Sequence, residues 1–170
     1  MGLNAGNAIT TGDRNIVIGA FQGTSSATVS NTMNIGGALF GTGMTGNTIT
    51  PAGNIGVGTT LPNSTLQVEG SLATKYVTTG ASTGTFVLNN THYTVRIFNA
   101  ISDINLPNPN TCLGRIYILI GSNGIGLKNI TVTGGTQIYD DVTNANITTI
   151  TSNQRYQIQS DGAGWIVIGR

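Results

Sequence analysis

"GNIGVGTTLPNSTLQVEG", residues 53–70, indicates the architecture of the N-terminal part of the chain. In its first half Ile55 and Val57 alternate with glycines, which is the period-two pattern of a β-strand. One face of this strand carries β-branched side chains, and the other face carries Gly56 and Gly58. Because glycine within a strand often marks a close approach of other backbone, we expect a neighbouring chain or repeat to pack there.

The same Asn-Ile element occurs at regular intervals before this stretch. Its asparagine lies at position 15 in "RNIVIG", at 34 in "MNIGG" and at 54 in "GNIGVG", so the spacings are 34 − 15 = 19 and 54 − 34 = 20 residues. One short apolar strand per unit, with turns of Gly, Asn and Thr between units, is typical of stacked β repeats that cannot bury an apolar face alone. We expect three close-packing glycines in such repeats: Gly36, Gly56 and Gly58.

The composition excludes two classes of partner. Charged residues are 8% of the 170 residues, against roughly 25% in typical soluble proteins. The hydrophobic fraction of 38% is too high for a disordered chain. The few charges are scattered and sum to +1, so there is no basic stripe for nucleic acid. The longest apolar run, Ile116–Ile120, is too short to span a membrane as a helix. We expect no nucleic-acid binding and no membrane insertion.

Metal and redox chemistry are also not expected. The chain has one cysteine and one histidine, Cys112 and His92, so it lacks an intrachain disulfide and a Cys/His metal cluster. Cys112 has no adjacent cationic or histidine residue, which favours a partly buried thiol over a reactive one. No glycine-rich stretch has the order of a phosphate-binding loop. We expect no metal site and no cofactor.

From about Tyr76 the sequence changes to longer alternating strands with more aromatic residues. Helical spacing of apolar residues is nearly absent throughout. Turn signals such as "NPN", "GSNG" and "SDGAG" separate the candidate strands. These strands begin near Thr85, Tyr93, Arg115, Asn129, Thr136, Ala145, Arg155 and Gly164. The expected fold is all-β, with a repetitive shaft over residues 1–72 and a jelly-roll-like β-sandwich over 73–170.

Two consecutive segments carry a family resemblance. "SNTMNIGGALFGTGMTG", residues 30–46, and "AGNIGVGTTLPNSTLQVEG", residues 52–70, resemble shaft segments of bacteriophage tail-fibre and tail-appendage proteins and of related injection-system fibres. The shared elements are Asn34–Gly36, Phe40–Gly43, and Gly53–Thr60 with Pro62. The earlier "GLNAGNAITTGDRNIVIGAF" is similar to head repeats of trimeric autotransporter adhesins.

The resemblance implies a homotrimer. Its shaft would be a trimeric β-helix or a stack of β repeats in which the three chains intertwine. The resemblance to shaft and head repeats covers about residues 2–70. The C-terminal part is similar in layout to domains at the ends of such fibres, from "NLPNPNTCLGRIYILI" to "YQIQSDGAGWIVIG". Nothing in the sequence resembles the self-cleaving chaperone domain that ends many of them. Either the C-terminal domain templates the trimer, or the chain is a mature or truncated fragment.

Carboxylates give little sign of catalysis. A glycosidase usually needs two carboxylates at a set separation. On a strand, Asp140 and Asp141 would point to opposite faces, because adjacent residues alternate. In a turn, both carboxylates would be solvated. Ca²⁺ binding and catalysis are the alternatives to these two interpretations. Asp161 in "SDGAG" is a turn residue, and His92 has no nucleophile to serve. We expect no enzyme activity.

Aromatic residues are the remaining candidates for ligand contact. Trp165 either stacks on a sugar or fills the core, and the sequence leaves both interpretations open. Tyr139, beside Asp140 and Asp141, is expected in an exposed loop. These four residues are the candidate receptor or glycan contacts.

The expected function is that of a structural fibre protein of a virion tail or similar extracellular appendage. It would project from the particle and bind a host-surface receptor, a glycan or a protein, through its C-terminal domain. Other tail or fibre subunits would be its further partners. The alternatives are a cell-surface adhesin or filament subunit, and a fibre tip that depolymerises polysaccharide.

Overall fold

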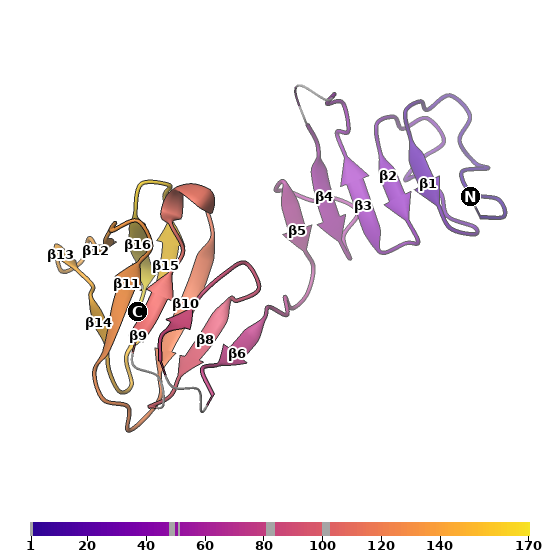
Figure 1. Cartoon of the computed structure of the whole chain (residues 1–170). Helices are drawn as coiled ribbons and strands as arrows, with labels where there is room; N and C mark the ends of the chain where they lie inside the picture. Colours follow the sequence, from indigo (N-terminus) through magenta and orange to yellow (C-terminus); the bar gives the residue numbers. More distant parts are fainter. Residues whose placement is uncertain (1, 48–49, 51, 81–83, 100–102) are drawn as a thin grey trace. The chain divides into compact units, whose positions relative to one another are not determined.

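The computed structural model describes residues 2–47, 50, 52–80, 84–99 and 103–170 (Figure 1). The chain divides into two compact units, Met1–Leu72 and Ala73–Arg170. The division falls where the composition of the sequence changes. Strands dominate both units, and no α-helix occurs among the described residues, so the expected all-β class is confirmed.

The N-terminal unit is a single five-stranded sheet in chain order (Figure 1). Its strands are β1 (Ile16–Ile18), β2 (Met33–Ile35), β3 (Leu39–Thr42), β4 (Asn54–Val57) and β5 (Leu66–Val68). The β1–β2 and β4–β5 pairs are parallel, and β3 is antiparallel to both of its neighbours. The Asn-Ile repeats therefore form β1, β2 and β4, which all run in the same direction.

The repeated asparagines attach the connecting loops to one face of this sheet. Each donates from its side-chain amide to a loop carbonyl: Asn15 to Val29 at 2.7 Å, Asn34 to Gly23 at 2.8 Å and Asn54 to Pro62 at 3.1 Å. Strand alternation places the isoleucine that follows each asparagine on the opposite face. In each repeat the asparagine therefore binds a loop on one face of the sheet, and the isoleucine lies on the other, apolar face.

The three glycines expected to admit other backbone have different roles. A Cβ at Gly56 would collide with the backbone oxygen of Thr59, so the close neighbour is the chain's own turn after β4. Gly58 and Gly36 have φ of +76° and +61°, a conformation that side chains other than glycine rarely adopt. Nothing lies within 4 Å of a Cβ at Gly36, so within the chain this glycine serves a turn.

The C-terminal unit consists of two sheets that pack face to face (Figure 1). One sheet has the order β13 (Ala145–Asn146), β12 (Ile138–Asp140), β16 (Trp165–Gly169), β15 (Arg155–Ser160), β10 (Ile116–Gly121), β8 (Thr94–Ile97) and β6 (Tyr76–Thr78). The other has the order β14 (Thr149–Ile150), β11 (Lys128–Val132), β9 (Asp103–Leu106) and β7 (Phe86–Val87). A 3₁₀ turn, η1 (Pro109–Thr111), follows β9.

Strand pairing in this unit differs from that of a jelly roll, whose strands are antiparallel. From β6 to β12 successive strands alternate between the two sheets. A chain that crosses over after every strand returns to each sheet in the same direction, so β6, β8 and β10 pair in parallel, as do β7, β9 and β11. The β15–β16 hairpin then inserts antiparallel beside β10, which makes the sheet mixed.

Both sheets contribute to one hydrophobic core. Its buried members all lie between Leu88 and Trp165. They are Leu88, Val95, Ile97, Ile104, Leu106, Cys112, Tyr117, Leu119, Ile125, Ile130, Ile138, Ile150, Tyr156, Ile158 and Trp165. The C-terminal unit therefore has a core of its own, whereas no large hydrophobic side chain described in the N-terminal unit is buried.

Replacing Asn54 by Ala should destabilise the N-terminal unit by about 1 kcal/mol, because the hydrogen bond to Pro62 is lost. Every Tyr and Trp of the chain lies at or after Tyr76, so tryptophan fluorescence reports only the C-terminal unit. We expect the urea concentration at the midpoint of unfolding to fall when it is measured by far-ultraviolet circular dichroism. The midpoint measured by tryptophan fluorescence should not change. Asn63→Ala is the control, since no side-chain hydrogen bond of Asn63 is found among the described residues. Equal effects of both variants would contradict the role of Asn54.

Candidate functional site

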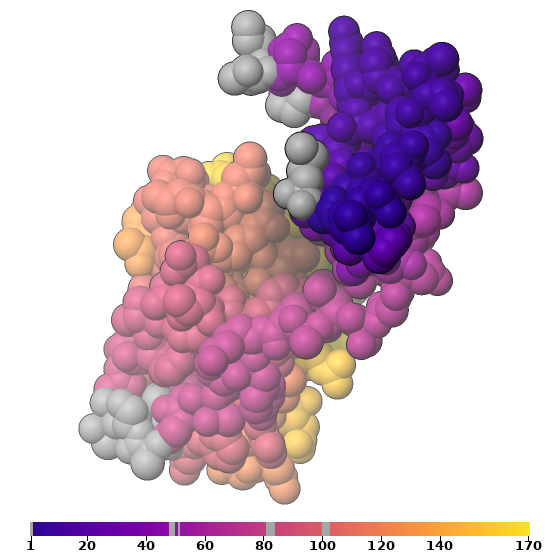
Figure 2. All heavy atoms as spheres, turned by 90° about the vertical axis from the view of Figure 1, so that its right-hand side faces the viewer, coloured from indigo at the N-terminus to yellow at the C-terminus, as the bar shows by residue number. Residues whose placement is uncertain are grey.

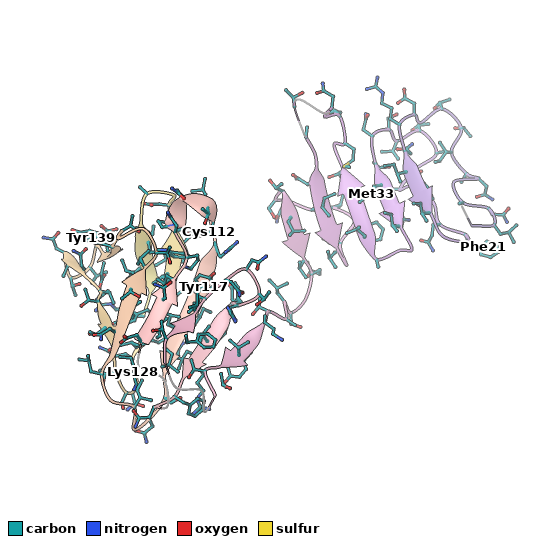
Figure 3. All side chains as sticks on the ribbon, viewed as in Figure 1. Phe21, Met33, Cys112, Tyr117, Lys128 and Tyr139 are labelled. Carbon is teal, nitrogen blue, oxygen red and sulfur yellow. The ribbon has the colours of Figure 1, made fainter. Side chains whose placement is uncertain are left out.

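One face of the N-terminal sheet is entirely apolar. The strand register aligns two rows of residues across all five strands. The first row is Ile16, Met33, Gly41, Ile55 and Leu66, and the second is Ile18, Ile35, Leu39, Val57 and Val68. Residues two apart in a strand share a face, so both rows lie on the same side. We call these ten residues the apolar face; Figure 3 labels Met33 within it.

Much of the apolar face is open to solvent within a single chain. The exposed fractions are 46% for Ile16 and Ile18, 39% for Val57 and 63% for Leu66. At Gly41, where the row lacks a side chain, the sulfur of Met44 would lie 3.0 Å from an added Cβ, so Met44 fills that position. A contiguous apolar surface of this kind usually marks an interaction site.

The opposite face of the sheet is covered by the chain's own loops. Its central row is Val17, Asn34, Phe40, Gly56 and Gln67. The N-terminal turns hydrogen-bond to the following loop, as in the bonds from Gly6 to Gln22 and from Thr10 to Ala27. In the space-filling view the residues at the start of the chain, in indigo, lie together on the side of the unit that faces the viewer (Figure 2). Together with the asparagine hydrogen bonds, these contacts hold the described loops on the opposite face, whose central row is half-buried or buried, whereas much of the apolar face is exposed.

Trp165 is a core residue and presents no face to a ligand. Its side chain is fully buried, and its indole Nε1 donates to the carbonyl of Pro107 at 3.2 Å. The indole stacks on the ring of Tyr117 with centroids 5.3 Å apart. Of the two interpretations that the sequence leaves open, the structure supports the core role.

Asp140 is also buried, contrary to the expectation of a solvated loop. Its carboxylate accepts hydrogen bonds from the Val142 amide at 3.0 Å and the Thr143 hydroxyl at 2.9 Å, and it forms an ion pair with Arg170. Because these partners occupy it, Asp140 anchors the end of β12. Sequence reasoning missed Arg170, since no spacing pattern connects it with Asp140.

Tyr139 and Asp141 are the two candidates that reach solvent. Tyr139 lies within β12 and not in the expected loop; it is 37% exposed, and its hydroxyl donates to the side chain of Asn144 (Figure 3 labels Tyr139). Asp141 is exposed. The four candidate residues thus belong to two environments and do not form one recognition surface.

His92 is held as a neutral structural group. Its Nδ1 accepts a hydrogen bond from the Asn89 amide at 3.0 Å, and its ring lies 5.3 Å from that of Phe86. Burial, and secondarily the positive charge of Lys75, lower the pKa of His92 below 6.5. In the turn before β16, backbone amides of Gly164 and Ala163 lower the pKa of Asp161.

The described part of the chain contains neither a cluster of metal-ligating side chains nor a helix that could span a membrane. Among the described residues, no three His, Cys, Asp or Glu side chains gather into a potential metal site. The same residues contain no helix long and apolar enough to cross a membrane. No family model, curated protein or solved structure matches the chain.

Removing the Asp140 carboxylate should destabilise the C-terminal unit by about 2 kcal/mol, because Asp140→Ala loses two hydrogen bonds and leaves Arg170 unpaired. Asp141→Ala is the matched control next to it and should change the free energy of unfolding by less than about 0.5 kcal/mol. Urea unfolding followed by Trp165 fluorescence measures both. Similar values for the two variants would contradict the anchoring role.

Protonation of His92 should make the C-terminal unit less stable in mild acid. A lowered native pKa means that the unfolded chain binds the proton more readily, so this stabilisation is present above pH 6.5 and is lost as the pH falls towards the native pKa. We expect the midpoint of urea unfolding to fall between about pH 7 and about pH 5.5, and to fall less in His92→Gln. The chain has one histidine, so its NMR titration gives the pKa directly. A native pKa at or above 6.5 would refute this prediction.

Proposed function

We propose that the chain is a structural fibre subunit that self-associates as a homotrimer through the apolar face. The N-terminal unit would form the shaft, and the C-terminal unit would attach to a host-surface receptor, a glycan or a protein. The fibre would belong to a virion tail or a similar extracellular appendage, together with other fibre subunits. The single observation that carries the proposal is the uncovered apolar face of the five-stranded sheet.

Self-association follows from the imbalance between the two faces of the sheet. The loops on the opposite face are attached by Asn15, Asn34 and Asn54, so they do not cover the apolar face. Burial of large aliphatic side chains is the main favourable term in both folding and association. If each chain turns its apolar face inward, the association supplies the core that one chain lacks, and the loops face solvent.

The number three rests on the resemblance to tail-fibre shafts, carried by Asn34–Gly36, Phe40–Gly43 and Gly53–Thr60. In an assembly of this kind, folding and association of the shaft are linked, because an isolated protomer leaves its apolar rows in water. The core of the C-terminal unit lies within one chain, so this unit can fold before the shafts associate.

A non-catalytic role is part of the proposal. Glycoside hydrolysis usually requires two carboxylates that face a common substrate. Of the six acidic residues, Asp140 is occupied by Arg170 and Thr143, and Asp161 accepts the backbone amides of its own turn. Incubation with host polysaccharides should release no new reducing ends, and release of such ends would contradict this part of the proposal.

Light scattering tests the proposal. The native chain should have three times the 17.5 kDa mass of one chain. Val57→Asp places a carboxylate on the apolar face and should dissociate the assembly, because burying an unpaired charge costs several kcal/mol. Thr28→Asp adds the same charge at an exposed loop position and should leave the mass unchanged. A monomeric native chain, or equal effects of the two variants, would refute the proposal.

A further inference from the structure

A groove in the C-terminal unit has the chemistry of an anion site. It has a volume of about 410 Å³ and is lined by Asn153, Gln154, Arg155, Tyr156 and Arg170. Asn153 and Gln154 lie in the turn that leads into β15, Arg155 and Tyr156 are the first residues of β15, and Arg170 follows β16. Volumes of 300–1,000 Å³ are typical of sites for small ligands, and no acidic residue lines this groove.

The guanidinium groups of Arg155 and Arg170 have N–H donors that are available to a ligand. Two of the seven Lys and Arg residues of the chain lie here. Arg155 is exposed and has no ion-pair partner among the described residues. The side chain of Arg170 is 44% exposed, and its ion pair with Asp140 fixes its position. A guanidinium has five N–H donors in a rigid fork, so Arg170 can bind Asp140 and still donate to a ligand.

Tyr156 adds a polar group that lacks a partner. The residue is only 7% exposed, and no hydrogen bond to its hydroxyl is found among the described residues. Burial raises its pKa above 10, so the hydroxyl keeps its proton and can donate. The hydroxyl is not one of the buried polar atoms without a partner in the described part of the chain, so it reaches solvent and can donate to a ligand in the groove. Gln154 accepts from the Thr151 amide at 2.8 Å through Oε1, which leaves its NH₂ group available.

We infer that this groove binds the carboxylate of an acidic sugar, a uronic or sialic acid, in a host-surface glycan. The inference rests on the proposed attachment function and names its ligand class. The planar arginine fork matches a carboxylate, the tyrosine hydroxyl adds a donor, and the amides of Asn153 and Gln154 suit sugar hydroxyls. A long polyanion such as nucleic acid fits less well, because the chain has no basic stripe to continue the site.

Isothermal titration of the whole protein tests this inference. The probes are an oligomer of glucuronic acid, a glucose oligomer of equal length and a trisaccharide ending in sialic acid. We expect at least one acidic probe to bind roughly tenfold or more tightly than the neutral one, and the comparison of the two acidic probes identifies the sugar. Equal affinity for the acidic and neutral probes would overturn the inference, as would equal affinity for inorganic phosphate.

Point variants place the binding in the groove. Arg155→Gln and Tyr156→Phe should each weaken binding of the acidic oligomer roughly fivefold or more, whereas Arg14→Gln, which removes the same charge in the N-terminal unit, should not. Unchanged binding in both groove variants would refute the site. The mass of the same samples separates the two proposals: a trimer that ignores acidic sugars refutes only this inference, and a monomer that binds them refutes only the trimeric fibre.

Discussion

The uncovered apolar face of the N-terminal sheet is the constraint on which the rest of this account depends. Nine aliphatic or methionine side chains and Gly41 line one side of a single layer, and the chain's loops are attached to the other side. A sheet needs a second layer to bury such a face. The described residues of the N-terminal unit form one layer of strands, and we propose that a second copy of this face supplies the other layer.

The two units differ in how the apolar faces of their sheets are covered. In the C-terminal unit the chain crosses between two sheets after nearly every strand, so each sheet becomes the cover of the other. In the N-terminal unit the turns between strands are short or polar, and the strands remain in one layer. One unit thus has a core within the chain, and the other leaves its apolar face exposed, which is the basis of the proposed assembly. The groove that we propose for recognition lies in the C-terminal unit and is lined by Arg155 and Tyr156.

Much of the local structure could be predicted from the sequence, but the long-range pairing could not. Alternation at Ile55 and Val57 predicts a strand, and the Asn-Ile repeat predicts equivalent strands. The role of Gly56 depended on the position of Thr59, three residues later in a turn that alternation does not describe. The parallel pairing of β6, β8 and β10 and of β7, β9 and β11 was not predicted, because apolar and polar residues alternate in the same way in parallel and antiparallel strands. The burial of Asp140 was missed because its partner Arg170 lies thirty positions away in sequence, directly after β16, and only the sheet pairing of β12 with β16 brings the two together.

The most direct test of the central claim is the solvent exposure of methyl groups on the apolar face in solution. Methyl NMR with a soluble paramagnetic agent compares Ile18 and Val57 with two internal references. Ile104 is fully buried in the C-terminal core, and Val142 is 85% exposed. The account predicts that Ile18 and Val57 are protected like Ile104, because other copies cover them. Relaxation enhancement equal to that of Val142 would contradict it.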